Sequence, residues 1–119
     1  MKTIDFRYLV CSPDLNAHGT LHGGTLLRWI DEATGMHSRK LANRVCVTRF
    51  MTDIEFVSTG QRGDIMKVST FLTNVGTTSL TFRVQVEEDV SGRLIADVGK
   101  IVFVSLDHQS NPVPHGVIM

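Results

Sequence analysis

The sequence predicts a single α+β domain in which an antiparallel sheet packs against one long helix. Three observations lead to this fold class. Apolar residues recur at helical spacing in only one long segment, from Gly23 or Gly24 to about Asn43. The chain after that segment is rich in Val, Phe, Ile and Thr and is divided by short turn-forming sequences. A length of 119 residues with 42% hydrophobic content suits one domain, residues 1–119, with one modest core.

The part before the helix divides into a strand and a loop. Residues 5–11 form a short apolar run that favours a strand. Residues 12–21 contain Ser, Pro, Asp, Asn and Gly, which is typical of a loop. In the helix itself Leu26, Ile30 and Ala33 have the spacing of a buried face.

Four strands are predicted after the helix. Residues 45–57 and 65–75 are apolar, β-branched runs, and residues 58–64 between them have the composition of a turn. Residues 76–78 indicate a second tight turn or bulge.

The next strand shows the clearest alternation in the chain. Apolar and polar residues alternate strictly over 80–87, which predicts a strand with one buried and one solvent-exposed face. Residues 89–92 indicate a hairpin turn, and residues 93–107 the last strand. We expect the tail from His108 to be irregular because it contains two prolines and a glycine.

The helix has no other helix on which to pack, so the sheet must cover it. A curved antiparallel sheet around one central helix is the hotdog architecture. One such layer leaves part of the sheet and of the helix uncovered. We therefore expect a homodimer with a sheet that is continuous across both copies.

Composition excludes several classes of function. Lys+Arg and Asp+Glu are both 12, so the formal net charge is zero, which argues against a general nucleic-acid-binding surface. No signal-peptide core or apolar run of transmembrane length is present, so no membrane association is expected. Cys11 and Cys46 lack metal-ligand spacing, so we expect two free thiols in the cytoplasm. A disulfide between them is the alternative. The five histidines form no paired metal motif.

The segment 22–35 carries the chemistry. A glycine pair opens the helix, whose free N–H groups can polarise a carbonyl, and Asp31 lies beside the apolar stripe of the same helix. This is the outline of a small hydrolytic site. From spacing alone, a catalytic role of Asp31 is as well supported as a structural one, in which it is a solvated residue or forms an intersubunit salt bridge with Arg28 or Arg39. Glu32 points about 100° away around the helix and is the second candidate.

Other residues allow a functional and a structural interpretation. Gly35 lies on the face of Asp31, and we favour close packing at the dimer interface over ligand contact. Cys46 is a conceivable nucleophile but has no histidine at a recognisable spacing, which favours a buried, inert thiol. Arg44 and Arg62 are typical surface residues, and either has the geometry to contact phosphates.

A set of ordered motifs resembles the YciA-like acyl-CoA hydrolases, which are hotdog-fold thioesterases. The resemblance covers nearly the whole chain in one register. It is carried by Asn16-Ala17-His18-Gly19-Thr20-Leu21-His22-Gly23-Gly24, the helix with Asp31, Val47 to Phe56, Gly63-Asp64 and Gly76-Thr77-Thr78-Ser79.

The resemblance implies hydrolysis of an acyl-CoA to a free acid and CoA, without a metal or a cofactor other than the CoA of the substrate. In this family the helix acid activates water or attacks directly, a role that falls to Asp31, and Asn16 positions the water or the thioester. The amides of Gly23 and Gly24 polarise the carbonyl. The implied substrate-binding residues also include His22, Phe56, Gly76, Thr77, Thr78, Ser79 and Arg62, with the Thr-Ser segment along the pantetheine arm.

The resemblance further implies that Asn and Asp come from opposite subunits and that dimers assemble into tetramers or hexamers. Two basic positions of the relatives are absent, because Asn74-Val75 and Val57-Ser58 stand there. The alternatives are a phenylacetate-type aryl-CoA thioesterase and a non-catalytic acyl-CoA sensor, which would have lost the helix acid. Hydratase chemistry would need an Asp–His pair, for which Asp14 and His18 are the candidates.

Overall fold

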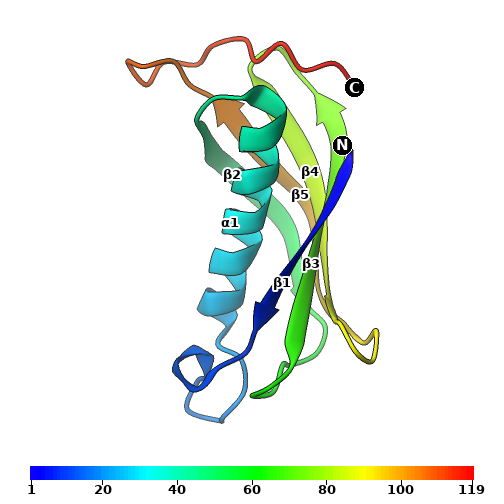
Figure 1. Cartoon of the computed structure of the whole chain (residues 1–119). Coiled ribbons are helices and arrows are strands. Elements are labelled where there is room, and N and C mark those ends of the chain that lie inside the picture. Colours follow the sequence, from blue (N-terminus) through cyan, green and yellow to red (C-terminus); the bar gives the residue numbers. More distant parts are fainter.

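The computed structural model describes all 119 residues and contains one long helix on one face of a five-stranded sheet (Figure 1). A 3-10 turn, η1 (Ser12–Asp14), precedes the helix α1 (Gly23–Ala42). The strands, in chain order, are β1 (Thr3–Leu9), β2 (Cys46–Phe56), β3 (Ile65–Val75), β4 (Ser79–Glu88) and β5 (Leu94–Ser105). The α+β class and the predicted hotdog arrangement are confirmed.

The predicted boundaries differ from the structure mainly at the N-terminus. The first strand begins and ends two residues before the predicted 5–11, because its pairing with β3 runs from Thr3 opposite Phe71 to Leu9 opposite Ile65. The loop 12–21 also contains η1, which was not predicted. A carboxylate oxygen of Asp14 accepts the N–H of Cys11 at 2.8 Å and holds this turn.

Both ends of α1 are capped by the residue that directly precedes or follows the helix. His22 is the N-cap, and its Nδ1 accepts the N–H of Gly24 at 2.9 Å. Asn43 adopts the left-handed conformation, with φ of 53°, and donates its N–H to the carbonyl of Arg39. Asn is one of the few residues that tolerates this conformation, so the helix ends here.

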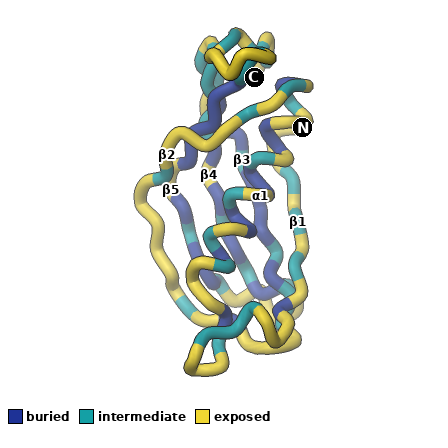
Figure 2. Tube along the Cα trace, turned by 90° about the vertical axis from the view of Figure 1, so that its left-hand side faces the viewer, coloured by how far each residue is buried: buried dark blue, intermediate teal, exposed yellow.

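The sheet has the order β1-β3-β4-β5-β2, and every neighbouring pair is antiparallel. The buried faces of β3, β4 and β5 lie against α1, and Figure 2 shows burial concentrated on these three strands and the facing side of the helix. Fully buried Ile30 and Ala33 come from the helix, and Phe82 and Val84 from the centre of the sheet. None of the helices combines the length and apolar character that a membrane span requires.

A buried histidine joins the helix, the sheet and the N-terminus. His37 is fully buried on α1, with Nδ1 at 2.7 Å from Oγ1 of Thr70 and Nε2 at 2.9 Å from the carbonyl oxygen of Met1. A carbonyl can only accept, so Nε2 donates its proton to Met1, and the Thr70 hydroxyl that contacts Nδ1 also lies 3.3 Å from the carbonyl oxygen of Ile4. Burial lowers the pKa of His37, because it disfavours the charged ring.

The edge strand β2 is the least covered part of the sheet (Figure 2). It is irregular: Asp53 has a φ of 56°, and a Cβ on the facing Gly99 would lie only 3.0 Å from the Asp53 Cβ. The strand has an unpaired edge, and apolar side chains on it and just beyond it are 38–60% exposed: Val45, Val47, Phe50, Ile54, Phe56 and Val57. Such an edge is expected to be covered by another chain.

Candidate active site

The start of α1 leaves a backbone donor free. Gly24 donates its N–H to the ring of His22, whereas the N–H of Gly23 has no partner in the chain. Phe56, at the end of β2, lies beside it, since a methyl group on Gly23 would be 3.8 Å from the Phe56 Cζ. A free amide at a helix N-terminus next to an aromatic side chain is suited to hold a carbonyl oxygen.

The loop before the helix is organised by Asn16. Its Oδ1 accepts the N–H of His18 at 2.9 Å and of Thr20 at 3.1 Å, and its Nδ2 donates to Oγ1 of Thr20 at 3.0 Å. Asn16 therefore shapes the loop that leads to Gly23.

A small cavity opens where this loop meets the helix start. Its volume is about 160 Å³, and its lining includes the polar Asn16 and Thr20 and several apolar side chains. Three of the site residues predicted from the sequence line this cavity: Asn16, Gly23 and Phe56. The lining residues are Asn16, Thr20, Leu21, Gly23, Leu26, Phe56, Ser58, Thr59, Gly60 and Ile95.

Asp31 lies elsewhere, at the middle of the helix. It is half-buried, and its carboxylate accepts a hydrogen bond from the hydroxyl of Thr48 on β2. Within the chain it forms no ion pair with Arg28 or Arg39, and the intersubunit salt bridge considered from the sequence stays a prediction. Eight residues along an α-helix correspond to about 12 Å, so Asp31 is well removed from Gly23 in the same chain.

Thr48 is the residue that sequence reasoning missed. It was noted only as part of a motif, with no role of its own. Its contact with Asp31 depends on β2 running back along α1, and no local spacing signals such an approach. Glu32, the second acid candidate, is exposed and accepts no hydrogen bond from a side chain, which leaves Asp31 as the positioned carboxylate.

The turn between β3 and β4 lies at the opposite end of the molecule from Gly23 (Figure 1). Its carbonyl groups are bonded to β5 and to the C-terminal tail: Ser105 at the end of β5 donates its N–H to Thr78 O at 2.9 Å, and His115 of the tail donates its N–H to Thr77 O at 3.2 Å. The ring Nε2 of His115 is 2.9 Å from Ser79 O. Within one chain the structure thus does not bring Gly76–Ser79 together with Asn16 and Gly23.

Arg62 and His22 are exposed, and neither lines the small cavity. Arg62 follows Gln61, which pairs with Thr20 in an isolated bridge, so it lies at the Asn16 end of the chain. His22 acts as the helix cap described above. Their predicted contacts with substrate stay predictions.

Several alternative chemistries find little geometric support. The Asp14 carboxylate caps η1 and forms no hydrogen bond with the His18 ring, so the Asp–His pair of a hydratase is not formed. Burial raises the pKa of the Cys46 thiol, which disfavours the thiolate that a nucleophile needs. Cys11 and Cys46 are both free thiols. No three His, Cys, Asp or Glu side chains gather as a group able to hold a metal ion.

Gly35 faces β5 within the chain. A Cβ at this position would lie 3.4 Å from the ring of Phe103, which is ordinary van der Waals contact, so the sheet does not require a glycine here. The close packing at a dimer interface that we favour for Gly35 stays a prediction. The glycine also lines an open groove on the outer side of the helix.

An antiparallel sheet packed on one long helix places the chain in the class of hotdog-fold proteins. The sequence model of the thioesterase superfamily matches residues 18–95. This chain belongs to the thioesterase superfamily, and the resemblance inferred from its motifs is confirmed.

The relatives are acyl-CoA hydrolases by name. The chain is similar to the uncharacterized acyl-CoA thioester hydrolase YkhA of Bacillus subtilis (strain 168), with 33% identity over 104 residues, which is 85% of this chain. It spans 60% of the length of YkhA. Its fold is similar to that of an apo-hexameric acyl-CoA thioesterase, with a TM-score of 0.85 and 30% identity, covering 95% of this chain and 74% of that one.

The chain is also similar to the acyl-CoA hydrolase of Staphylococcus aureus in complex with butyryl coenzyme A, coenzyme A and coenzyme A disulfide. The TM-score is 0.82 and the identity 29%, covering 95% of this chain and 68% of that one. Three structures of this hydrolase carry alanine in place of one asparagine, one aspartate or one threonine, at positions 15 and 17 residues apart. Asn16, Asp31 and Thr48 have the same spacing in this chain.

Proposed function

We propose that this protein is an acyl-CoA thioesterase, which hydrolyses the thioester of an acyl-CoA to a carboxylic acid and CoA. The observation that carries the proposal is the carboxylate of Asp31, half-buried on the helix and held by the Thr48 hydroxyl. Support comes from the spacing of Asn16, Asp31 and Thr48, which matches three residues of a hydrolase that binds butyryl-CoA. A carboxylate kept in one orientation suits a base or a nucleophile.

The chemistry assigns a separate role to each residue. Asp31 takes a proton from water as the water adds to the carbonyl carbon, and passes that proton to the departing CoA sulfur. Alternatively, Asp31 adds to that carbon itself and forms a mixed anhydride, which water then hydrolyses to the acid and the free carboxylate. The Thr48 hydroxyl occupies one carboxylate oxygen and leaves the other for this work. The N–H of Gly23 stabilises the negative charge that develops on the carbonyl oxygen, and the carbon–sulfur bond then breaks to release CoA. Removal of one such donor typically costs about 3–4 kcal/mol of barrier.

The separation of Asp31 from Gly23 makes a second copy part of the proposal. The edge of β2 is unpaired and carries exposed apolar side chains such as Phe50 and Ile54. If two copies pair antiparallel along β2, a two-fold axis reverses one helix relative to the other. The Gly23 end of one copy then approaches the middle of the partner helix, where Asp31 lies. Hexameric relatives are consistent with a dimer as the basic unit.

The same reversal gives the remaining predicted residues a place in one composite site. It moves the turn Gly76–Ser79 of one copy towards the Asn16 and Arg62 end of the other. The carbonyls of Thr77 and Ser79 are bonded to His115 of the tail and that of Thr78 to Ser105 of β5, so these residues would contact a pantetheine arm through their side chains. The cytoplasmic location expected from the two thiols stays a prediction.

The test is thiol release by the purified protein over acetyl-, short-, medium-, long-chain and aryl-CoA substrates. Asp31→Asn and Asp31→Ala are compared with Glu32→Gln, which changes the neighbouring exposed carboxylate. We expect the Asp31 variants to lose about 10²-fold or more of kcat and Glu32→Gln to keep its activity. A protein that binds acyl-CoA but hydrolyses none of the panel would be a sensor. Turnover confined to aryl-CoA would indicate the phenylacetate-type enzyme.

A further inference from the structure

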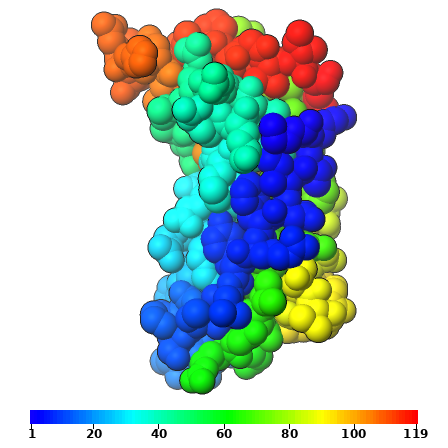
Figure 3. All heavy atoms as spheres, viewed as in Figure 1, coloured from blue at the N-terminus to red at the C-terminus, as the bar shows by residue number.

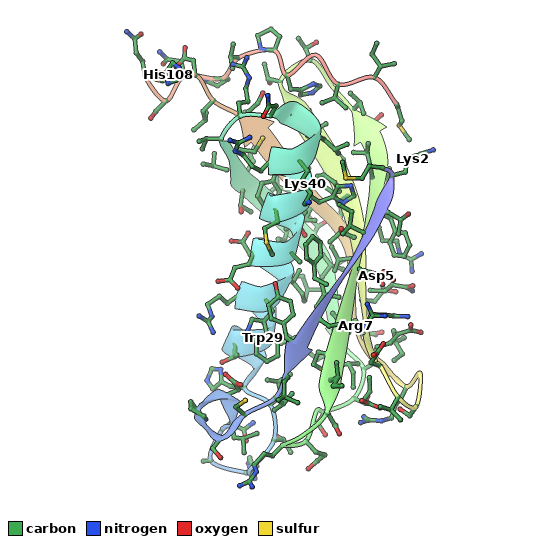
Figure 4. The ribbon with its side chains drawn as sticks, in the orientation of Figure 1. Lys2, Asp5, Arg7, Trp29, Lys40 and His108 are labelled. Carbon is green, nitrogen blue, oxygen red and sulfur yellow. The ribbon has the colours of Figure 1, made fainter.

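A basic cleft lies at the C-terminal end of α1, where the tail folds back beside the segment that joins the helix to β2. Its volume is about 520 Å³, within the usual range for ligand sites. Figure 4 shows His108 in the tail beyond the end of the helix, and Lys40 on the last turns of the helix. The lining residues are Arg39, Asn43, Arg44, Val45, Leu106, Asp107, His108 and Ser110.

Hydrogen bonds hold the walls of this cleft in place. Leu106 donates its N–H to the carbonyl of Val45 at 2.9 Å, which joins the tail to the segment after the helix. The Asp107 carboxylate accepts the N–H groups of Gln109 and Asn111, both at 2.9 Å, and so holds the wall in a turn. In Figure 3 this part of the tail, in orange, stands out from the body next to the end of the helix.

The cationic side chains of the cleft are not neutralised within the chain. The four ion pairs of the protein lie elsewhere and use Arg7, Lys67, Arg83 and Arg93. Neither Arg39 nor Arg44 has a carboxylate oxygen within 4.0 Å, although Asp107 lines the same cleft.

One of these arginines also has an unsatisfied donor. The Nε of Arg44 is buried and has no hydrogen-bond partner. Buried polar atoms are almost always hydrogen-bonded, and an unpartnered one costs free energy until a ligand or water satisfies it. Arg39 uses one guanidinium nitrogen to donate to Asn43 Oδ1 at 3.2 Å and keeps its other donors. An anion with several oxygen acceptors fits this set of donors.

We propose that the basic cleft binds the phosphate groups of the CoA moiety, through Arg39, Arg44 and His108. This inference rests on the proposed thioesterase function. The relatives carry basic residues at two positions where this chain has Asn74-Val75 and Val57-Ser58. The basic cleft supplies positive charge from other positions. Arginine suits the task because its planar fork of donors matches phosphate oxygens.

An open groove extends along the helix from the basic cleft towards the level of Asp31. The groove has a volume of about 490 Å³, begins at Glu32, next to Asp31, and ends at Arg39, which it shares with the cleft. Asp31 and Arg39 are eight residues apart, or about 12 Å along the helix axis. In CoA the extended pantetheine arm separates the thioester from the phosphates. One molecule can therefore place its thioester near Asp31 and its phosphates in the basic cleft.

The experiment compares a short-chain acyl-CoA with the S-acyl pantetheine of the same acyl group, which has the thioester and the arm but no phosphates. For the wild-type protein we expect a lower KM for the acyl-CoA, and a KM that rises with salt only for that substrate. Arg44→Gln should raise the KM for acyl-CoA about tenfold or more. Its kcat, and its KM for acyl-pantetheine, should not change. Arg39→Gln should act in the same direction, and Arg7→Gln, on the far side of the sheet, is the matched control.

The outcomes separate this inference from the proposed function. Equal effects of Arg44→Gln on both substrates, or no effect on either, would overturn the phosphate site while hydrolysis itself continues. If the wild type hydrolyses neither substrate, the proposed function fails. Calorimetric binding of CoA and of pantetheine then tests the basic cleft alone. Loss of CoA affinity, but not pantetheine affinity, in Arg44→Gln supports the site, and unchanged CoA affinity overturns it.

Discussion

The Thr48 hydroxyl donates a hydrogen bond to the Asp31 carboxylate, and this contact joins the edge strand β2 to the middle of the helix. The two residues are brought together because β2 runs back along α1 after the turn at Asn43. The orientation of the carboxylate thus depends on the strand with the unpaired apolar edge. If β2 is also the dimer interface, as we propose, assembly and orientation of the acid are coupled.

We expect Thr48→Val to lower kcat about tenfold with little change in KM, because the valine keeps the size of the side chain and removes the donor that orients Asp31. Steady-state kinetics with a short-chain acyl-CoA measure the effect. Thr48→Ser keeps the hydroxyl and should retain most of the activity. Equal losses in both variants would mean that packing, rather than the hydrogen bond, is what matters at this position.

The fold could be predicted because its signals are local. The alternation from Leu80 to Val86 and the helical spacing of Leu26, Ile30 and Ala33 follow from which face of each element is buried, and the structure has both. The N-terminal strand was placed two residues too late. Its ends are set by pairing with β3, and the apolar run 5–11 carries no information about that partner.

The candidate site was less accessible from the sequence. Gly23, Asn16 and Asp31 could be singled out because of the motif that contains them. Their surroundings could not, because they come from a strand distant in the sequence: Phe56 of β2 lies beside Gly23, and Thr48 of β2 beside Asp31. Thr48 was missed because its contact is formed only by the folded chain. The substrate contact of His22 stays a prediction, and the structure adds that its ring caps the helix, which its place in the motif does not reveal.

The capping role of His22 gives a prediction about stability. His22→Ala removes the acceptor for the Gly24 N–H and should lower the free energy of unfolding by about 1 kcal/mol. His22→Asn supplies another side-chain acceptor at the N-cap and should restore most of it. Urea unfolding followed by circular dichroism measures both. His18→Ala, which changes an exposed loop histidine whose ring forms no hydrogen bond, serves as the control.

The buried His37 should make stability depend on pH. Burial lowers the pKa of His37 below its usual 6.5, the nearby N-terminal amine lowers it further, and the hydrogen bond to Met1 opposes both. The unfolded chain therefore binds the proton more readily than the folded protein. This contribution to stability is fully present above about pH 6.5 and is lost as the pH falls below that value. Urea midpoints measured between pH 7.5 and pH 5 should fall accordingly.

The comparison that isolates His37 is His37→Gln against His18→Gln. Glutamine offers polar atoms to Thr70 and Met1 but does not titrate, so His37→Gln should be less stable at neutral pH and lose much of the slope between pH 6.5 and pH 5. His18→Gln should keep the wild-type slope. A slope that survives unchanged in His37→Gln would assign the pH dependence to other groups.

A composite site makes a prediction that no single-chain site would make. Asn16→Ala and Asp31→Asn should each be inactive alone, because every site of such a dimer lacks one residue. In a dimer that contains one chain of each kind, the two defects fall in the same site and the other site is intact. Random mixing produces half mixed dimers, so co-refolding equal amounts should restore about a quarter of wild-type activity. Activity that stays at the level of the parents after mixing, with mixed dimers demonstrated by mass spectrometry, would show that Asn16 and Asp31 act within one chain.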